Sequence, residues 1–266
     1  MALPSTRARI VVRNAFIALV AGGQLWCALE LLGVKLPAPS TVLGLEVALI
    51  VLAALFGLRH DGEDAELARW SPVGVFIWIV WGTFYFGAAH ITEPPHARTF
   101  SDAILDRLPL VPAFTSIYLG VHIFSMVPYC AIPEQRLLRR YMLGNILIIL
   151  VSAIAWVTLP VRLDRPPFDW EAPGFGTWLL RGVYRFDPTT NCFPSAHCAI
   201  AIYAAIALRF ASWRLFAWGM LTAALICLST IMTKQHYVAD VAGGAVLAAI
   251  ASWAVGRRRR TLQPSR

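Results

Sequence analysis

Long apolar blocks separated by short polar segments dominate the chain. The blocks are roughly 20 residues long, which is the length an α-helix needs to cross about 30 Å of hydrocarbon. Strands of a membrane β-barrel would instead alternate polar and apolar residues over shorter stretches. The pattern therefore predicts an all-α, polytopic membrane helical bundle of about eight spans, at about 14–33, 40–58, 72–91, 109–131, 141–161, 194–211, 213–233 and 236–256.

The composition agrees with a lipid environment. Hydrophobic residues make up 58% of the chain and charged residues only 14%, whereas soluble domains contain about 25% charged residues. The net charge of +8 could indicate a nucleic-acid partner, but the basic residues gather at the ends of apolar blocks and form no stripe or patch. We predict a membrane protein with no nucleic-acid partner, and the sequence leaves its oligomeric state open.

The distribution of Lys and Arg predicts the orientation of the spans. When sides alternate along the eight spans, most of the 23 Lys and Arg residues fall on the side that holds both termini, which predicts that both termini are cytoplasmic. The first block follows Arg7, Arg9 and Arg13 and lacks a clear cleavage site, so we interpret it as an uncleaved span. The segment 162–193 and the span ends near His197 and Lys234 then meet on the outer face.

The first polar cluster on that face is the sequence "PVRLDRPPF", which contains Arg162 and Arg165. Arginines at span ends commonly reach the interface to contact water. Their guanidinium groups also suit phosphate oxygens, so the same residues are candidate phosphate ligands. The two prolines after Arg165 stiffen the backbone and favour a fixed position for it.

The second cluster is "FPSAH", directly before an apolar run. Ser195 is a plausible cap for a helix whose first backbone N–H groups would then face outward and could bind an anion. His197 falls in the first turn of that helix. Taken alone, it is better interpreted as a histidine of the membrane interface.

The third cluster is "TKQHYVAD", which contains Lys234, His236 and Asp240. A histidine and an aspartate four residues apart share one face of a helix, so the carboxylate can accept a hydrogen bond from one ring nitrogen. That bond would fix the tautomer and raise the basicity of the other nitrogen, as a histidine nucleophile requires. An aspartate within a span is costly without a partner, which makes the pair more informative than either residue.

The cysteines give no metal-binding pattern. Their number is odd and their spacing irregular, so we interpret them as packing residues, with a Cys192–Cys198 bridge left open. The histidine clusters also lack the several carboxylates of a magnesium or calcium site. We predict neither a metal nor another cofactor.

Together the three clusters resemble the motifs of the type 2 phosphatidic acid phosphatase (PAP2) superfamily. Matching residues are Arg165-Pro166, the segment 194–197, and Ser229 with His236 and Asp240. The resemblance covers about 72–256 and implies a six-helix catalytic core there, two additional spans in 1–71 and a basic cytoplasmic tail in 257–266. It also implies a lipid phosphate or phospholipid substrate and an active site that faces outside.

The resemblance implies roles for these residues. His236, oriented by Asp240, would attack phosphorus to form a phosphohistidine, and His197 would protonate the departing oxygen. Four further residues would stabilise the phosphoryl oxygens: Arg162, Arg165, Lys234 and Ser195.

Two positions depart from the motifs, because Thr158 and Thr230 stand where the family has a lysine and an arginine. Fewer cations suit the single charge of a phosphodiester better than the nearly double charge of a monoester. In this respect the chain looks like the inositol-phosphorylceramide synthase-like branch of lipid phosphotransferases. Hydrolysis and transfer to an acceptor lipid both remain open.

Two alternatives from other classes fit the same residues. A transporter or lipid-binding protein could use His197, His236 and Asp240 to relay protons or hold a ligand without turnover. A haem protein would need paired axial histidines at matched depth, and only His122 lies well inside a predicted span.

Overall fold

The computed structural model describes residues 6–34, 71–92 and 96–256, with isolated positions between 38 and 48. Within these residues the fold is all-helical, as predicted, and contains no β-strand. The predicted second span with Glu46 and the basic tail 257–266 lie outside the described residues, apart from those isolated positions. The helices are α1 (Thr6–Leu31), α3 (Ser71–Ile91), α4 (Ala103–Arg107), the 3-10 helix η3 (Pro112–Phe114), α5 (Thr115–Phe124), α6 (Val127–Ala131), α7 (Gln135–Thr158), α8 (Phe175–Phe186), α9 (Ala196–Leu208), α10 (Trp213–Met232) and α11 (Val238–Gly256).

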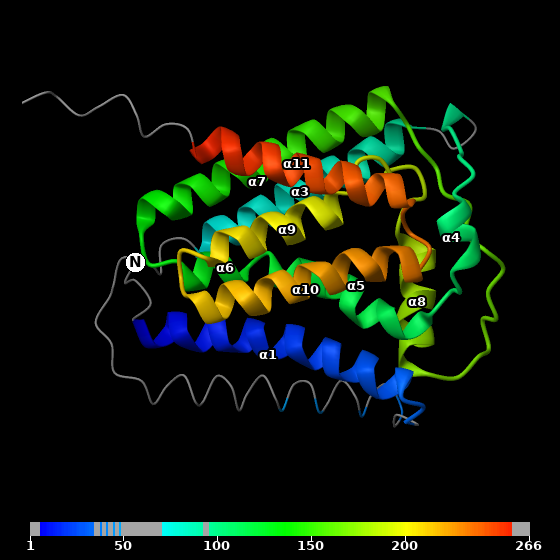
Figure 1. Ribbon diagram of the computed structural model, residues 1–266, viewed down its shortest axis with the longest axis horizontal. Helices are drawn as coiled ribbons and strands as arrows, with labels where there is room; N and C mark the ends of the chain where they lie inside the picture. Colours follow the sequence, from blue (N-terminus) through cyan, green and yellow to red (C-terminus); the bar gives the residue numbers. More distant parts are fainter. Residues whose placement is uncertain are drawn as a thin grey trace, which may run out of the picture.

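Four of the described helices are long and apolar enough to cross a membrane, which supports the prediction of a membrane protein. They span Ile10–Leu31, Gln135–Thr158, Trp213–Met232 and Val238–Val255. Figure 1 shows them roughly along one direction, with α9 among them. The count of eight spans stays a prediction.

Helix α9 forms the centre of the bundle. Every residue from Ala196 to Leu208 is buried except Ile202 and Ile206, which are half-buried. Many of these residues are alanines, and small side chains allow helices to approach closely where lipid gives no hydrophobic drive for association. Helices α7, α10 and α11 pack around it, as Figure 1 shows. The second cluster therefore begins the most enclosed helix of the fold.

Two elements differ from the predicted spans. The span predicted at 109–131 is divided into η3, α5 and α6, with a break at Ser125 and Met126. Pro112 and Pro128 each stand at the start of a helical piece, where the missing N–H costs no hydrogen bond. The predicted loop 162–193 contains α8, an amphipathic helix that lies across one end of the bundle in Figure 1.

The three clusters meet at that end of the bundle. Isolated β-bridges join Arg98 to Val161 and Val161 to Asn191, and the Ser195 N–H donates to the Asp240 carbonyl at 3.0 Å. Figure 1 shows the start of α1 and the end of α11 at the opposite end. The three segments thus lie together in the structure, while the side of the membrane that this end faces stays a prediction.

Candidate active site

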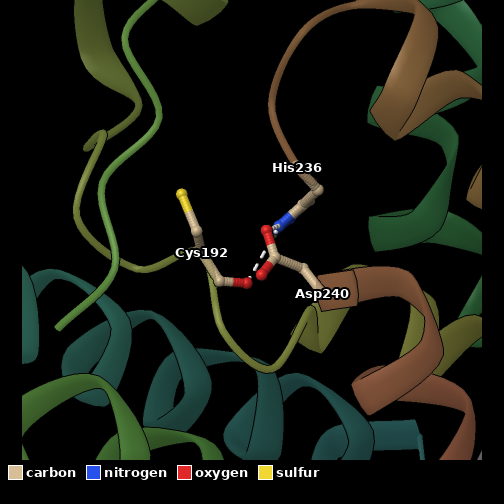
Figure 2. A group of neighbouring side chains, drawn as sticks. All are labelled: Cys192, His236 and Asp240. Atoms are coloured by element: carbon tan, nitrogen blue, oxygen red, sulfur yellow. Dashed lines mark hydrogen bonds and ion pairs between the residues drawn. The ribbon is translucent and has the colours of Figure 1, made fainter. Parts of the chain in front are cut away.

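His236 lies in the turn between α10 and α11. Lys234 in this turn has a φ of 54°, a left-handed conformation that reverses the chain after α10. The Nδ1 atom of His236 lies 3.0 Å from the Cys192 carbonyl oxygen and 3.5 Å from Oδ2 of Asp240, as Figure 2 shows. Both neighbours are acceptors, so Nδ1 carries the proton and Nε2 keeps its lone pair.

Asp240 is held in place by the backbone around it. It is only 2% exposed, and its Oδ2 accepts a hydrogen bond from the Tyr237 N–H at 2.8 Å. Burial alone would lower the pKa of His236, but the hydrogen bond and negative charge of Asp240 raise that pKa above its ordinary value. The sequence predicted this pair, but it did not reveal that the Cys192 carbonyl makes the shorter contact.

The side-chain donors of Cys192, His236 and Asp240 lie within 4.8 Å of one another, the proximity that a metal site requires. The Cys192 sulfur has a hydrogen-bond acceptor of its own. It lies 3.2 Å from the Thr189 carbonyl oxygen, and burial raises the pKa of the thiol. Figure 2 shows its sulfur directed away from His236 and Asp240. The three residues therefore fit a hydrogen-bonded arrangement around His236.

The Cys192–Cys198 bridge that the sequence left open is absent from the structure. All five cysteines are described, and none of them forms a disulfide bond. The Cys198 sulfur lies 3.8 Å from the Thr230 hydroxyl, whereas the Cys192 sulfur faces Thr189. The two thiols have different neighbours.

Ser195 caps α9, as the sequence predicts. Its hydroxyl accepts a hydrogen bond from the Cys198 N–H at 3.3 Å. His197 follows in the first turn and is only 3% exposed. Its ring centroid lies 6.0 Å from that of His236, and its Nε2 has no hydrogen-bond partner among the described residues. The two histidines are neighbours, and each keeps one ring nitrogen available for chemistry.

Arg165 is fixed by three oxygen acceptors. Its guanidinium donates to the carbonyls of Tyr184 at 2.7 Å and Asp187 at 2.8 Å, and to the Gln235 side chain at 3.0 Å. It also lies over the Tyr184 ring, 4.7 Å from the centroid. All three acceptors are neutral, so these contacts hold the guanidinium in place without cancelling its charge. Gln235 directly precedes His236 in the chain, so this contact ties Arg165 to the turn that holds His236.

The other two predicted cations have partners of their own. Arg162 forms an ion pair with Asp164 at 3.0 Å, and the Asp164 side chain is 70% exposed. The Lys234 ammonium donates to the Leu105 carbonyl at 2.5 Å and the Leu108 carbonyl at 2.7 Å, which ties α4 to the turn after α10. These contacts show positioning roles that the sequence did not reveal, and phosphate binding by Arg162 and Lys234 stays a prediction.

Two large cavities reach the site, and they share no lining residue. The first has a volume of about 710 Å³ and is lined by His197 and Asp187, by aromatic side chains of α3 and by Arg181 and Arg185 of α8. The second has a volume of about 610 Å³ and is lined by Asp240, Phe193 and residues of the segment 98–104. The size of each is typical of small-molecule sites. The first cavity therefore reaches the residue His197.

Two acidic residues organise this end of the bundle, and sequence reasoning missed the role of Asp187. Asp187 accepts hydrogen bonds from the Tyr85 and Tyr118 hydroxyls, each at 2.6 Å. Asp102 caps α4 through one carboxylate oxygen and accepts the Val238 N–H at the start of α11 with the other, at 2.8 Å. Asp187 stands shortly before "FPSAH", but nothing in the sequence indicated its tyrosine partners.

Comparison with known proteins supports this region as the functional one. Residues 137–263 match the family model described as PAP2 superfamily. No curated protein and no solved structure matches the chain. The matched region begins in α7 and contains all seven predicted site residues: Arg162, Arg165, Ser195, His197, Lys234, His236 and Asp240. The C-terminal half of this all-helical chain is thus similar to a superfamily that generally comprises phosphatases and phosphotransferases.

Proposed function

We propose that this protein is an integral membrane lipid phosphatase or phosphotransferase that acts on a lipid phosphate ester through a phosphohistidine. One observation carries the proposal. His236 and His197 lie 6.0 Å apart, and the Nδ1 proton of His236 is fixed by the Cys192 carbonyl and Asp240. This arrangement provides a nucleophile and an acid in one buried site.

In the proposed first step, Nε2 of His236 attacks phosphorus while the ester P–O bond breaks. The electron pair of that bond goes to the leaving oxygen, which takes a proton from His197. The resulting phosphohistidine carries a positive ring, and Asp240 at 3.5 Å stabilises that charge. In the second step neutral His197 removes a proton from water or an acceptor hydroxyl, whose oxygen attacks phosphorus as the P–N bond breaks.

Charge that develops on the phosphoryl oxygens needs fixed donors. Arg165 is the best-supported of them, because neutral oxygens hold its guanidinium without pairing its charge. The backbone N–H groups at the start of α9 follow the Ser195 cap and would add further donors. Arg162 and Lys234 would contribute only by giving up part of their present contacts.

The cation content favours a phosphodiester substrate and the inositol-phosphorylceramide synthase-like branch. Thr158 is exposed at the end of α7, and Thr230 is buried, so neither supplies the cation found in the family motifs. The ammonium of Lys234 already donates to two backbone carbonyls. Of the predicted phosphate ligands, Arg162 is already paired with Asp164, and Lys234 would have to leave these carbonyls. A site that relies mainly on Arg165 suits a substrate with a single negative charge.

We further propose that the site faces outside and both termini face the cytoplasm, on the basis of the Lys and Arg distribution.

One experiment tests the function. The purified full-length protein is incubated with a panel of lipid phosphomonoesters and phosphodiesters, with and without acceptor lipids, and the products are followed by mass spectrometry. We expect release or transfer of a phosphoryl-linked group, with diesters preferred. Binding of the lipids without any product would favour the transporter or lipid-binding alternative.

A further inference from the structure

The ring of His197 is oriented by aromatic packing. Its face stacks on Tyr118, with centroids 4.4 Å apart and planes 17° from parallel. Trp81 and His122 contact it edge-on, at 6.1 Å and 5.6 Å. Because its Nε2 has no hydrogen-bond partner among the described residues, the direction of that nitrogen depends on the rings around it.

Tyr118 is in turn fixed by Asp187. Its hydroxyl donates to Oδ2 of Asp187 at 2.6 Å, and Tyr85 donates to Oδ1 at the same distance. Hydrogen bonds of this length to a carboxylate are among the strong ones in proteins. The phenol on which His197 rests is therefore held at its far end by a charged acceptor.

Asp187 is also anchored through its backbone. Its carbonyl oxygen accepts a hydrogen bond from Arg165 at 2.8 Å, and its side chain lines the cavity that reaches His197. The carboxylate of Asp187 thus accepts a hydrogen bond from Tyr118, whose ring stacks on His197, while its carbonyl oxygen accepts one from Arg165. The two functions are separable, because a substitution of the carboxylate leaves the carbonyl in place.

We propose that Asp187 is a positioning residue that acts through Tyr118 to aim His197 at the leaving oxygen of the substrate. The inference rests on the proposed function, and it goes beyond it by assigning a role to two residues outside the three motifs. The proposal predicts a specific dependence of the rate on the leaving group. A misaimed acid slows only reactions whose leaving oxygen must be protonated as it departs.

The test compares leaving groups. Octyl phosphate has a leaving oxygen that needs a proton, and para-nitrophenyl phosphate has one that departs without it; their methyl esters form the matching diester pair. The quantity is kcat/KM, since it reports the steps up to departure of the leaving group and omits the later attack by water. For Asp187→Asn and Tyr118→Phe we expect a loss of about 10- to 100-fold on the octyl ester, which is smaller than the full contribution of about 100- to 10,000-fold that a general acid makes, because the acid is misaimed and still present. The nitrophenyl ester should show little change.

Two control variants make the outcome decisive. His197→Ala should give the same pattern with a larger loss on the octyl ester. Tyr85→Phe removes a hydrogen bond of equal length from the same carboxylate, but its ring is not the one stacked on His197, so it should keep the wild-type ratio between the two esters. Should Asp187→Asn fail to fold, Tyr118→Phe decides alone, because it keeps the stacked ring.

Equal losses on both esters would overturn the inference, since a merely structural role slows both. A wild-type protein that turns over neither ester pair would instead count against the proposed function.

Discussion

Helix α11 approaches the start of α9 so closely that a single methyl group would not fit between them. A Cβ atom added at Gly244 would lie 2.5 Å from the Ser195 carbonyl oxygen and 3.0 Å from the Cys198 Cβ. Ordinary contacts of a Cβ atom begin near 3.4 Å, so Gly244→Ala must separate the two helices by about 0.9 Å at this point. The obstructing atom is backbone, so no side-chain rotation relieves the clash.

The displacement falls between the two proposed catalytic histidines. Helix α9 carries His197, and α11 begins directly after the turn that holds His236. A misplacement of about 1 Å between reacting groups can cost about 100-fold in rate. We therefore expect kcat/KM of Gly244→Ala on the best lipid ester to fall by roughly that factor, with the protein still extracted in detergent as a folded species.

Gly87→Ala is the matched control, because no atom lies within 4 Å of the Cβ it would add on α3. It should retain wild-type kcat/KM, with a thermal transition at or above that of the wild type, because alanine favours a helix interior over glycine. If Gly244→Ala also retained wild-type kcat/KM, the reasoning that the α9–α11 contact sets the distance between the histidines would be refuted.

Three further predictions concern charge and orientation. Asp240→Asn removes the charge that raises the pKa of His236. Because only the neutral ring attacks phosphorus, the acidic limb of the plot of kcat/KM against pH should move to lower pH. A limb that does not move would contradict the interaction of Asp240 with His236. Asp102→Ala removes the cap of α4 and its link to α11 and should cost about 1–2 kcal/mol of unfolding free energy in detergent. Burial alone would raise the pKa of Asp102, but backbone N–H groups hold it below its ordinary value. The stabilisation by the charged carboxylate is therefore present above the ordinary pKa and is lost as pH falls through the folded-state pKa, so the difference between the melting curves of wild type and variant should shrink in acid. Arg185→Cys in an otherwise cysteine-free chain should react with a membrane-impermeant reagent in intact cells, whereas protection would place the site inside.

The sequence predicted those parts of the fold and site that depend on local pattern. Apolar blocks indicate helices in lipid because the backbone has no other way to satisfy its hydrogen bonds there. The spacing of His236 and Asp240 predicted their contact, and Ser195 was identified as a helix cap before the structure showed the bond to Cys198.

What the sequence could not give depends on contacts between distant segments. Every residue type has a backbone carbonyl, so the sequence cannot indicate that the carbonyl of Cys192 contacts His236. In the structure this carbonyl is closer to His236 Nδ1 than the Asp240 carboxylate is. The hydrogen bond between Tyr118 and Asp187 joins residues 69 positions apart. The sequence predicts Lys234 as a phosphate ligand at a span end. In the structure its ammonium donates hydrogen bonds to the carbonyl oxygens of Leu105 and Leu108.

The break in the span predicted at 109–131 has a similar origin. Its residues are mostly apolar, so the pattern predicts one helix, whereas Pro128 and the turn at Ser125 divide it in the structure. Helix α8 was missed for the opposite reason. Its amphipathic sequence contains Arg181 and Arg185 and resembled a polar loop.

The central claim is that His236 carries the phosphoryl group during turnover. The most direct measurement is to quench wild-type protein and the His236→Ala variant at high pH during reaction with para-nitrophenyl phosphate or its methyl ester, and then to map phosphoryl adducts by mass spectrometry of peptides. In the wild-type protein we expect a phosphoryl adduct on the peptide that contains His236. The His236→Ala variant should show neither the adduct nor turnover, although it should still be expressed and extracted normally. Substantial turnover by His236→Ala would contradict the claim.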